Sequence, residues 1–392
     1  MDRIVVVGGS VAAVNAADGL RRAGHEGEIT LVSAENVLPY DRPPLSKDAL
    51  REGQQHAALL IKEPGWYEEN AVDVSLGAAA VGLDAAGKTV FLKGGRELSY
   101  DGLVVATGSR TRPLPVLEGV PGVHEVRSLS DSLSLHEHLL PGRHLVVIGA
   151  GFIGLEVAAT ARKMGLDVSV VEIAPVPLTR VLGAELGRWF QEHHVGHGVN
   201  LYCGNEIERV ERTPNGSRVH LADGTVLVAD LIVAGVGVQP ATDWLDGSGV
   251  ETANGVVCDE MLRTTAPDVV AAGDLVHWPN RLFGETMRVE QWLNAVEQGV
   301  HAARTLLGES EPFAPVPYFW SDQFEAKVKF VGHVSGDDQV KITKADEKSL
   351  VALFGRGDRL RGVLCVNAPR QLALGKRAIL DGVSWADAVA GS

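Results

Sequence analysis

The chain has 392 residues, which is enough for two or three domains with cores of their own. Hydrophobic residues make up 45% and charged residues 22%, the usual balance of a soluble globular protein. The 36 basic and 50 acidic residues give a net charge of −14. This acidity argues against nucleic acid and anionic membranes as partners, because both attract basic surfaces. An acidic partner protein is not excluded, since docking depends on a local patch.

The three cysteines, Cys203, Cys258 and Cys365, lie far apart and form neither a CxxC pair nor a metal-ligand pattern. This spacing excludes a disulfide framework and a cluster held by four thiolates, and it favours a reducing compartment. Residues 1–3 lead directly into an apolar strand, with no signal-peptide pattern. No apolar run approaches the roughly 18 residues of a membrane span. We therefore expect a cytoplasmic protein.

The first predicted elements form a βαβ unit. Residues 4–7 (IVVV) are continuously apolar, as in a strand buried on both faces, and residues 8–10 (GGS) form a tight turn. A helix is predicted over 11–23, and a second strand over 28–33 is followed by Glu35.

The same pattern returns about 140 residues later, in a strand over 144–148, a GAGFIG turn, a helix, and a strand over 167–171 before Glu172. The segment 101–108 (DGLVVATG) also resembles 230–237 (DLIVAGVG). Two copies of one nucleotide-binding architecture explain both similarities.

Proline clusters at 112–115, 239–240 and 312–317 mark linkers. After the last of them, strands are predicted over 327–334, 339–343, 350–354 and 360–366, and helices over 369–380 and 384–389. The predicted fold class is α/β, with two Rossmann-like dinucleotide-binding domains and a C-terminal α+β domain.

The second turn has the residues that a dinucleotide requires. Gly149, Gly151 and Gly154 open a helix whose backbone N–H groups can bind a diphosphate without interference from side chains. Glu172 follows Gly154 by 18 residues, close to the spacing of about 20 for the acid that binds the ribose hydroxyls. Its carboxylate would also repel a 2′-phosphate, which favours NADH over NADPH.

The first turn departs from this pattern. It has Gly8, but Ser10 and Ala13 stand where the pattern has glycine; Glu35 supplies the ribose acid. Ala13 suits close packing of helix on strand, and Ser10 is small enough to approach or bond a phosphate. The strand 268–270 ends in the sequence AAGD, which places Asp274 where it could bond a flavin dinucleotide. The proline-rich loop 36–47 carries Arg42 and Lys47 and could cover a flavin ring.

Eight segments together resemble one family: residues 8–13, 39–47, 106–110, 149–154, 172, 273–274, 290–292 and 319–323. PYDRPPLSK, GFIGLEVAA, AAGD, VEQWLNA and YFWSDQ are their most specific parts. The family is that of the FAD-dependent, NADH-linked ferredoxin reductases of bacterial cytochrome P-450 and Rieske-type dioxygenase systems, the putidaredoxin reductase-like proteins. The resemblance covers essentially the whole chain.

The resemblance implies a glutathione reductase-like architecture. Its domains would be an FAD domain over 1–113 and 241–313, an NAD domain over 114–240 and a C-terminal domain over 314–392. A hydride would pass from NADH to FAD, and single electrons would pass from FAD to a [2Fe–2S] ferredoxin that feeds an oxygenase.

The resemblance also assigns residues by position. The FAD site would comprise Gly8, Ser10, Ala13, Glu35, Arg42, Lys47, Thr107, Asp274 and Trp292. The NADH site would comprise Gly149, Gly151, Ile153, Gly154, Glu172 and Gly237. Lys47 and Glu156 would pair near flavin N5, and Trp320 would position the ferredoxin or pass electrons to it. A patch of Arg281, Arg288, Arg304 and Lys327 would suit an acidic ferredoxin.

Several alternatives stay open or are disfavoured. Rubredoxin and monodehydroascorbate reductases share the fold, and an NADH-sensing flavoprotein of the apoptosis-inducing factor type is a further possibility. A disulfide reductase is disfavoured, because no cysteine pair follows Glu35. The 13 histidines include His136/His138 and His193/His194, and none has the spacing of a helical metal pair with an acidic base, so no metal site is predicted. Oligomeric state is left open.

Overall fold

The computed structural model describes residues 1–214 and 216–391. They form two compact units, each assembled from separate parts of the chain. The first unit comprises residues 1–41, 56–110 and 239–318, and the second comprises residues 42–55, 111–238 and 319–392. The boundaries expected from the sequence, including a separate domain from residue 314, stay a prediction. Strands β8 (Ser109–Thr111) and β17 (Val238–Pro240) lie where the chain passes from one unit to the other.

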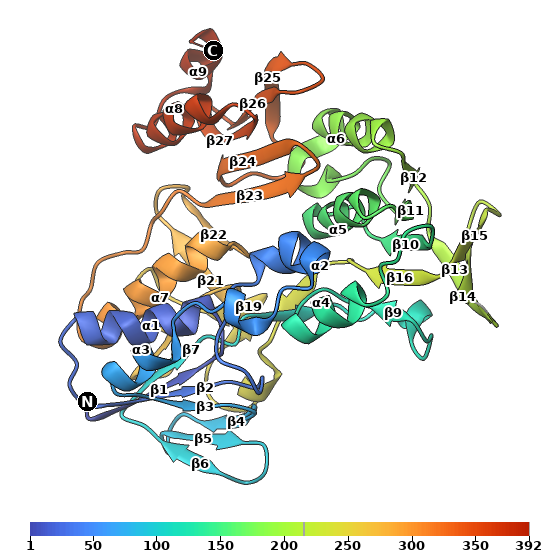
Figure 1. Cartoon of the computed structure of the whole chain (residues 1–392). Helices are drawn as coiled ribbons and strands as arrows, with labels where there is room; N and C mark the ends of the chain where they lie inside the picture. The colour runs from blue at the N-terminus through green and yellow to red at the C-terminus, as the bar shows by residue number, and fades with distance from the viewer. Residues whose placement is uncertain (215, 392) are drawn as a thin grey trace. The chain divides into compact units, whose positions relative to one another are not determined.

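The first unit is built on a parallel five-stranded sheet. Its spatial order is β20 (Val269–Ala271), β7 (Gly102–Val105), β1 (Arg3–Val7), β2 (Glu28–Val32) and β3 (Val72–Ser75). Helices α1 (Val11–Arg22) and α7 (Trp292–Leu306) lie side by side in Figure 1. Their close approach requires small residues, since a Cβ on Gly299 would lie 2.4 Å from the Ala12 carbonyl oxygen. A short helix, α3 (Pro64–Glu69), precedes β3.

Two smaller sheets complete the first unit. One is antiparallel and consists of β4 (Ala80–Asp84), β5 (Thr89–Leu92) and β6 (Glu97–Ser99). The other has the order β18 (Thr252–Ala253), β19 (Gly255–Val257), β21 (Val276–Asn280) and β22 (Glu285–Arg288).

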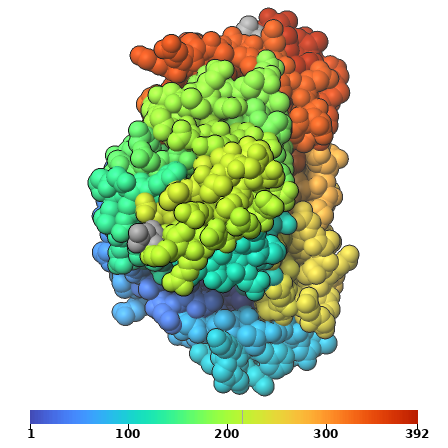
Figure 2. Space-filling model, turned by 90° about the vertical axis from the view of Figure 1, so that its right-hand side faces the viewer, coloured from blue at the N-terminus to red at the C-terminus, as the bar shows by residue number. Residues whose placement is uncertain are grey.

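The second unit repeats this plan. Its parallel sheet has the order β12 (Val199–Cys203), β11 (Asp167–Glu172), β10 (His144–Ile148), β16 (Leu231–Ala234) and β9 (Val123–His124). Helices α2 (Asp48–Glu52), α4 (Leu129–His136), α5 (Phe152–Lys163) and α6 (Thr179–Gly196) belong to the same unit. The antiparallel strands β13 (Ile207–Thr213), β14 (Gly216–Leu221) and β15 (Val226–Ala229) face the viewer in yellow-green in Figure 2.

The duplication predicted from the sequence extends to individual hydrogen bonds. Asp101 precedes β7, and its carboxylate accepts from the backbone N–H of Arg3 at 2.8 Å, at the start of β1. Asp230 precedes β16 and accepts from the backbone N–H of His144 at 2.8 Å, at the start of β10. Each acid therefore fixes the register of its central strand, and the two Rossmann-like folds are confirmed.

The C-terminal part folds as predicted, into an antiparallel sheet followed by helices. The sheet order is β23 (Tyr318–Gln323), β24 (Ala326–Gly332), β27 (Arg359–Val366), β26 (Leu350–Arg356) and β25 (Gln339–Ala345), and α8 (Pro369–Leu380) and α9 (Trp385–Ala390) follow. Phe330, Phe354 and Leu364 of this sheet share one buried core with Leu155 and Phe190. The prediction missed β23, because YFWSDQ mixes ring and polar side chains without alternation.

Candidate functional site

In the GAGFIG turn of the second unit, glycine is suited to each of its three positions for a different physical reason. A Cβ on Gly149, whose φ is +99°, would lie 2.5 Å from the Gly235 carbonyl oxygen. A Cβ on Gly154 would lie 2.1 Å from the Gly149 carbonyl oxygen, so this glycine lets α5 approach the turn. A Cβ on Gly151 would meet no atom of the described residues within 4 Å. The chain's own packing therefore does not require glycine at 151, and the open space suits a ligand at the N-terminus of α5.

Glu172 lies at the end of β11 and faces this turn. Its carboxylate accepts from the backbone N–H of Ala150 at 2.7 Å and from that of Ala174 at 2.8 Å. The two bonds hold the negative charge beside the phosphate turn while leaving lone pairs on both oxygens for ribose hydroxyls. Ile153 and Ile173 are 49% and 70% exposed. Ile173, which directly follows Glu172, was not singled out from the sequence.

The first turn shares with the second a first glycine that lies against a neighbouring carbonyl group, but its later side chains differ. A Cβ on Gly8 would lie 2.2 Å from the Ala106 carbonyl oxygen, and Ala13 is fully buried in α1. Ser10 is the N-cap residue of α1, yet its hydroxyl accepts from none of the helix amides among the described residues. That hydroxyl and the N-terminal amides of α1 are placed to meet an anion together.

Glu35, the predicted ribose acid of the first turn, is also held by a hydrogen bond. The Tyr40 hydroxyl donates to the Glu35 carboxylate at 2.6 Å. Glu35 lies three residues after the end of β2, whereas Glu172 is the last residue of β11, and the role of Glu35 as a ribose acid stays a prediction.

The Gly273–Asp274 turn after β20 is supported from three sides. The Ser109 hydroxyl donates to the Asp274 carboxylate at 2.9 Å, and the Arg288 guanidinium donates to the Asp274 carbonyl oxygen at 2.9 Å. The backbone N–H of Gly273 donates to Gln298 Oε1 at 2.8 Å. Gln298 is fully buried on α7, and sequence reasoning did not identify it.

Other predicted FAD residues of the first unit have partners within that unit. The Thr107 hydroxyl donates to the Ala241 carbonyl oxygen at 2.8 Å. Trp292 begins α7 and donates from Nε1 to the Asp41 carboxylate at 2.9 Å. Burial raises the pKa of Asp41, and the Trp292 hydrogen bond opposes that shift. Trp292 thus contacts Asp41, a residue within the proline-rich loop 36–47 that is predicted to cover a flavin.

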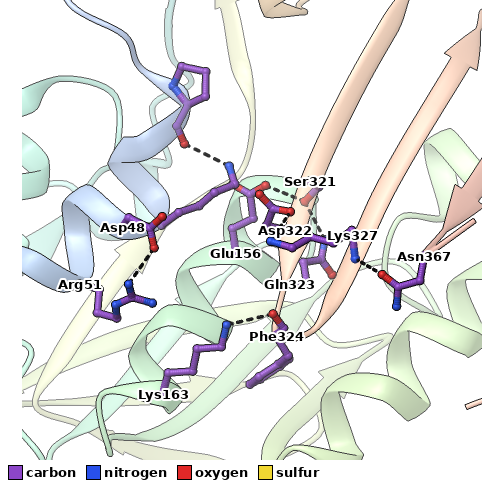
Figure 3. Close-up of polar contacts among 12 residues, drawn as sticks. Asp48, Arg51, Glu156, Lys163, Ser321, Asp322, Gln323, Phe324, Lys327 and Asn367 are labelled. Atoms are coloured by element: carbon purple, nitrogen blue, oxygen red, sulfur yellow. Dashed lines mark hydrogen bonds and ion pairs between the residues drawn. The ribbon is translucent and has the colours of Figure 1, made fainter. Parts of the chain in front are cut away.

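Lys47 and Glu156, which the resemblance implies to be a pair near flavin N5, form an ion pair in the second unit, and their place beside a flavin stays a prediction. The Glu156 carboxylate, only 2% exposed, accepts from Lys47 Nζ at 2.7 Å. It also accepts from the hydroxyl of Ser46 at 2.5 Å and from that of Ser321 at 2.6 Å. Figure 3 shows Glu156 on its helix opposite Ser321 of β23. Two separate segments of the chain, residues 46–47 and β23, therefore converge on one buried carboxylate of α5.

The network continues from Ser321 into the C-terminal sheet. Gln323 Nε2 donates to the Ser321 hydroxyl at 3.1 Å, and His194 Nε2 donates to Gln323 Oε1 at 2.9 Å. Burial lowers the pKa of His194 to about 4, so this ring is neutral at physiological pH. Glu156 was named from the sequence but Ser46, Ser321 and Gln323 were not, although all three lie inside motifs that had been identified there.

Two further predicted residues, Arg42 and Trp320, also belong to the second unit. The Arg42 guanidinium donates to the Arg127 carbonyl oxygen, and Trp320 is half-buried on β23. Gly237 has a φ of +97°, and a Cβ there would meet no described atom within 4 Å, as at Gly151.

The predicted basic patch is divided between the units. Arg281, Arg288 and Arg304 belong to the first unit and Lys327 to the second. Arg281 pairs with Glu260, Arg288 pairs with Glu290, and Lys327 pairs with Asp322 at 3.0 Å. These carboxylates neutralise most of the charge, and the docking role of the four residues stays a prediction.

No helix within residues 1–214 and 216–391 combines the length and apolar character needed to cross a membrane.

The chain is similar to reductases of known systems over almost its full length. It is 36% identical to rhodocoxin reductase of Rhodococcus erythropolis, covering 94% of this chain and 87% of that protein. It is 34% identical to the ferredoxin–NAD(+) reductase component of the p-cumate 2,3-dioxygenase system of Pseudomonas putida, covering 96% of this chain and 93% of that protein.

A solved structure agrees with these relatives. The crystal structure of the covalent putidaredoxin reductase–putidaredoxin complex superposes with a TM-score of 0.93 at 34% identity, covering 97% of this chain and 93% of that chain. The family model described as reductase C-terminal matches residues 318–391. The resemblance predicted from the motifs is confirmed. Since the model of the pyridine nucleotide-disulphide oxidoreductases matches residues 2–299, the chain belongs to that family.

Proposed function

We propose that the chain is an FAD-dependent NADH:ferredoxin reductase that serves a cytochrome P-450 or Rieske-type oxygenase. The observation that carries this proposal is the pair of strand–turn–helix units, each with a carboxylate held by hydrogen bonds at or after its second strand, together with the open space at Gly151. The relatives named above as reductases of ferredoxin-dependent systems support the choice of electron acceptor.

The residues of the first turn fit FAD. Ser10 and the N-terminal amides of α1 would bind the diphosphate, and Glu35 would accept from the adenosine ribose. Asp274, held by Ser109, would bond the ribityl or diphosphate portion. When bound, FAD supplies the chemistry, because it accepts a hydride and releases single electrons.

The residues of the second turn fit NADH. The backbone around Gly151 would bind its diphosphate, and Glu172 would accept from the adenosine ribose hydroxyls. Ile173, exposed beside this carboxylate, would pack against the adenine. The same carboxylate would repel the 2′-phosphate of NADPH, because two anions would share one small site.

Lys47, Glu156 and Trp320 are the proposed catalytic residues. The Glu156 carboxylate would hold the Lys47 ammonium in a fixed orientation as a positive charge near the flavin ring. Ser46 and Ser321 act on this pair as positioning residues, because their hydroxyls satisfy the remaining lone pairs of Glu156. Trp320 would guide the ferredoxin or pass electrons to it.

The cysteines argue against thiol chemistry. All three are free thiols, and burial raises the pKa of Cys203 to about 11 and that of Cys365 to about 12. Burial also raises the pKa of Cys258 strongly. Thiols of this kind are poor nucleophiles, so a disulfide or persulfide substrate is not supported. A reducing, cytoplasmic location is part of the proposal.

The test is anaerobic reduction of a purified [2Fe–2S] ferredoxin by NADH, with and without the FAD-loaded protein. The expected result is protein-dependent bleaching of the ferredoxin that saturates with ferredoxin and is much weaker with NADPH. Trp320→Ala should slow ferredoxin reduction and leave flavin reduction by NADH unchanged. If NADH reduces the flavin and no ferredoxin accepts electrons, the acceptor is a rubredoxin or a small molecule, or the protein is a signalling flavoprotein, and the proposal is wrong.

A further inference from the structure

A second group of chemically active side chains lies at the C-terminal end of α6. His193 and His197 are four residues apart and therefore project from the same side of the helix end. Glu325 lies in the turn that joins β23 to β24. One ring nitrogen of each histidine and one carboxylate oxygen of Glu325 lie within 4.8 Å of one another.

Hydrogen bonds define which nitrogen of His197 can bind a cation. Its Nδ1 lies 2.8 Å from the His193 carbonyl oxygen, which can only accept, so Nδ1 carries the hydrogen. Its Nε2 lies 2.9 Å from the Glu325 carboxylate. In the neutral ring this places a nitrogen lone pair against carboxylate lone pairs. A positive species between the two atoms, either a proton or a metal ion, is needed to make that contact favourable.

His193 is held in a comparable way. Its Nε2 lies 3.3 Å from the Gln323 carbonyl oxygen, so Nε2 carries the hydrogen and Nδ1 has the lone pair. The ring stacks on Trp189 with centroids 5.1 Å apart, while the His197 ring stacks on Phe324 at 3.9 Å. Both imidazoles are therefore oriented by neighbouring rings before any ligand binds.

The surroundings favour a cation. The final carbonyl groups of α6 carry the partial negative charge of a helix C-terminus. Glu325 adds a full negative charge, and its side chain is 57% exposed, so an ion can reach it from solvent. The nearby Lys163 ammonium donates to the Phe324 carbonyl oxygen at 3.0 Å, as Figure 3 shows, and it forms no hydrogen bond with Glu325 among those described.

We propose that His193, His197 and Glu325 bind a divalent transition-metal ion, with zinc as the expected metal. Two imidazoles and one carboxylate are a preferred zinc ligand set, with water completing the coordination. The ion would fasten the end of α6 to the β23–β24 turn, close to Gln323 of the Glu156 network. The site is independent of the proposed electron-transfer function, and sequence reasoning missed it because it paired His193 with His194 and not with His197.

The test uses the untagged, FAD-loaded protein after treatment with a chelator. Zinc is titrated in competition with a zinc-sensitive dye, and magnesium is the comparison metal. We expect one zinc ion per chain, no competition by magnesium, and a higher melting temperature with zinc bound. His197→Ala and Glu325→Gln should each weaken zinc binding by at least about tenfold and abolish the melting-temperature shift.

His220→Ala is the matched control. His220 also faces a carboxylate, that of Glu211 at 3.2 Å, but belongs to no three-residue cluster of this kind among the described residues. The control should bind zinc as the unchanged protein does. Absence of a one-to-one zinc complex, or equal zinc affinity in His197→Ala, Glu325→Gln and the control, would overturn the proposal. Glu325→Gln changes only an exposed side chain, so misfolding would not obscure the result, and FAD content and circular dichroism verify this.

Discussion

Replacing Glu156 with glutamine should destabilise the protein more than removing both partners of the Lys47–Glu156 pair. Glu156 is 2% exposed and Lys47 is 15% exposed, so both charges are largely removed from water. Breaking a buried pair by removing one partner costs about 3–5 kcal/mol. Because Lys47 keeps some contact with solvent, we expect Glu156→Gln to cost about 3 kcal/mol, near the lower limit of that range.

The double substitution Lys47→Met with Glu156→Gln removes the unpaired ammonium. Ser46 and Ser321 donate to different oxygens of Glu156, so a glutamine can accept from one hydroxyl through its oxygen and donate to the other through its amide N–H, which keeps the remaining polar groups satisfied. The double variant should therefore be more stable than Glu156→Gln alone, with a coupling energy of about 2 kcal/mol in the mutant cycle.

Urea unfolding at a fixed, saturating FAD concentration measures these differences, with tryptophan fluorescence and flavin release as separate probes. Glu52→Gln is the control, since it breaks the exposed Arg51–Glu52 pair and should leave the unfolding midpoint unchanged. A coupling energy below about 0.5 kcal/mol would refute the reasoning, because residues without shared partners add within that margin.

Three other predictions follow from single positions. Gly151→Val should raise the KM for NADH at least tenfold (about 1.4 kcal/mol), because the side chain would fill the space proposed for the diphosphate, and it should leave the urea unfolding midpoint unchanged. Gly154→Ala should instead lower the unfolding midpoint, because its Cβ would lie 2.1 Å from the Gly149 carbonyl oxygen. Glu172→Gln should raise the ratio of kcat/KM for NADPH to that for NADH about tenfold, measured by stopped-flow flavin reduction, because repulsion of the 2′-phosphate is lost. Burial lowers the pKa of His301 in the folded protein below its ordinary value of 6.5. The stability that comes from burying the neutral ring is therefore complete above pH 6.5, and it is lost as the pH falls from 6.5 toward the folded pKa, because the unfolded chain binds the proton first. His301→Gln should therefore make the urea unfolding midpoint fall less steeply between pH 7 and 5. If the midpoint falls as steeply in this variant as in the unchanged protein, His301 is not the source of the pH dependence.

The parallel sheets could be predicted because their strands carry their own signal. Residues 4–7 and 145–148 are continuously apolar, and each is followed by a turn in which the first glycine is sterically required. The helix predicted over 369–380 has those bounds in the structure, since Pro369 marks its start and Gly382 follows its end. Local sequence is sufficient where local geometry determines the element.

The chain's division into units could not be predicted in the same way. The resemblance places residues 42–55 in the FAD domain, and that division stays a prediction; by their contacts these residues belong to the compact unit that contains α5. Leu50 and the hydroxyl of Ser46 make their contacts with residues about 100 positions away. Such contacts depend on which surfaces meet in the folded chain, and the hydrophobic pattern of a single segment does not predict them.

Glu156 shows how a local sequence signal and long-range contacts together define a site. It is the only acidic residue of α5, between Leu155 and Val157, which are both fully buried. A buried ion pair contributes little net stability compared with apolar side chains of similar size, so packing alone does not explain a carboxylate in this position. Its donors come from the proline-rich loop before α2 and from β23, and neither segment is adjacent to α5 in sequence. The C-terminal sheet thereby contributes Ser321 directly to the proposed catalytic pair, and the hydrogen bond from Ser321 helps to set the orientation of the buried charge.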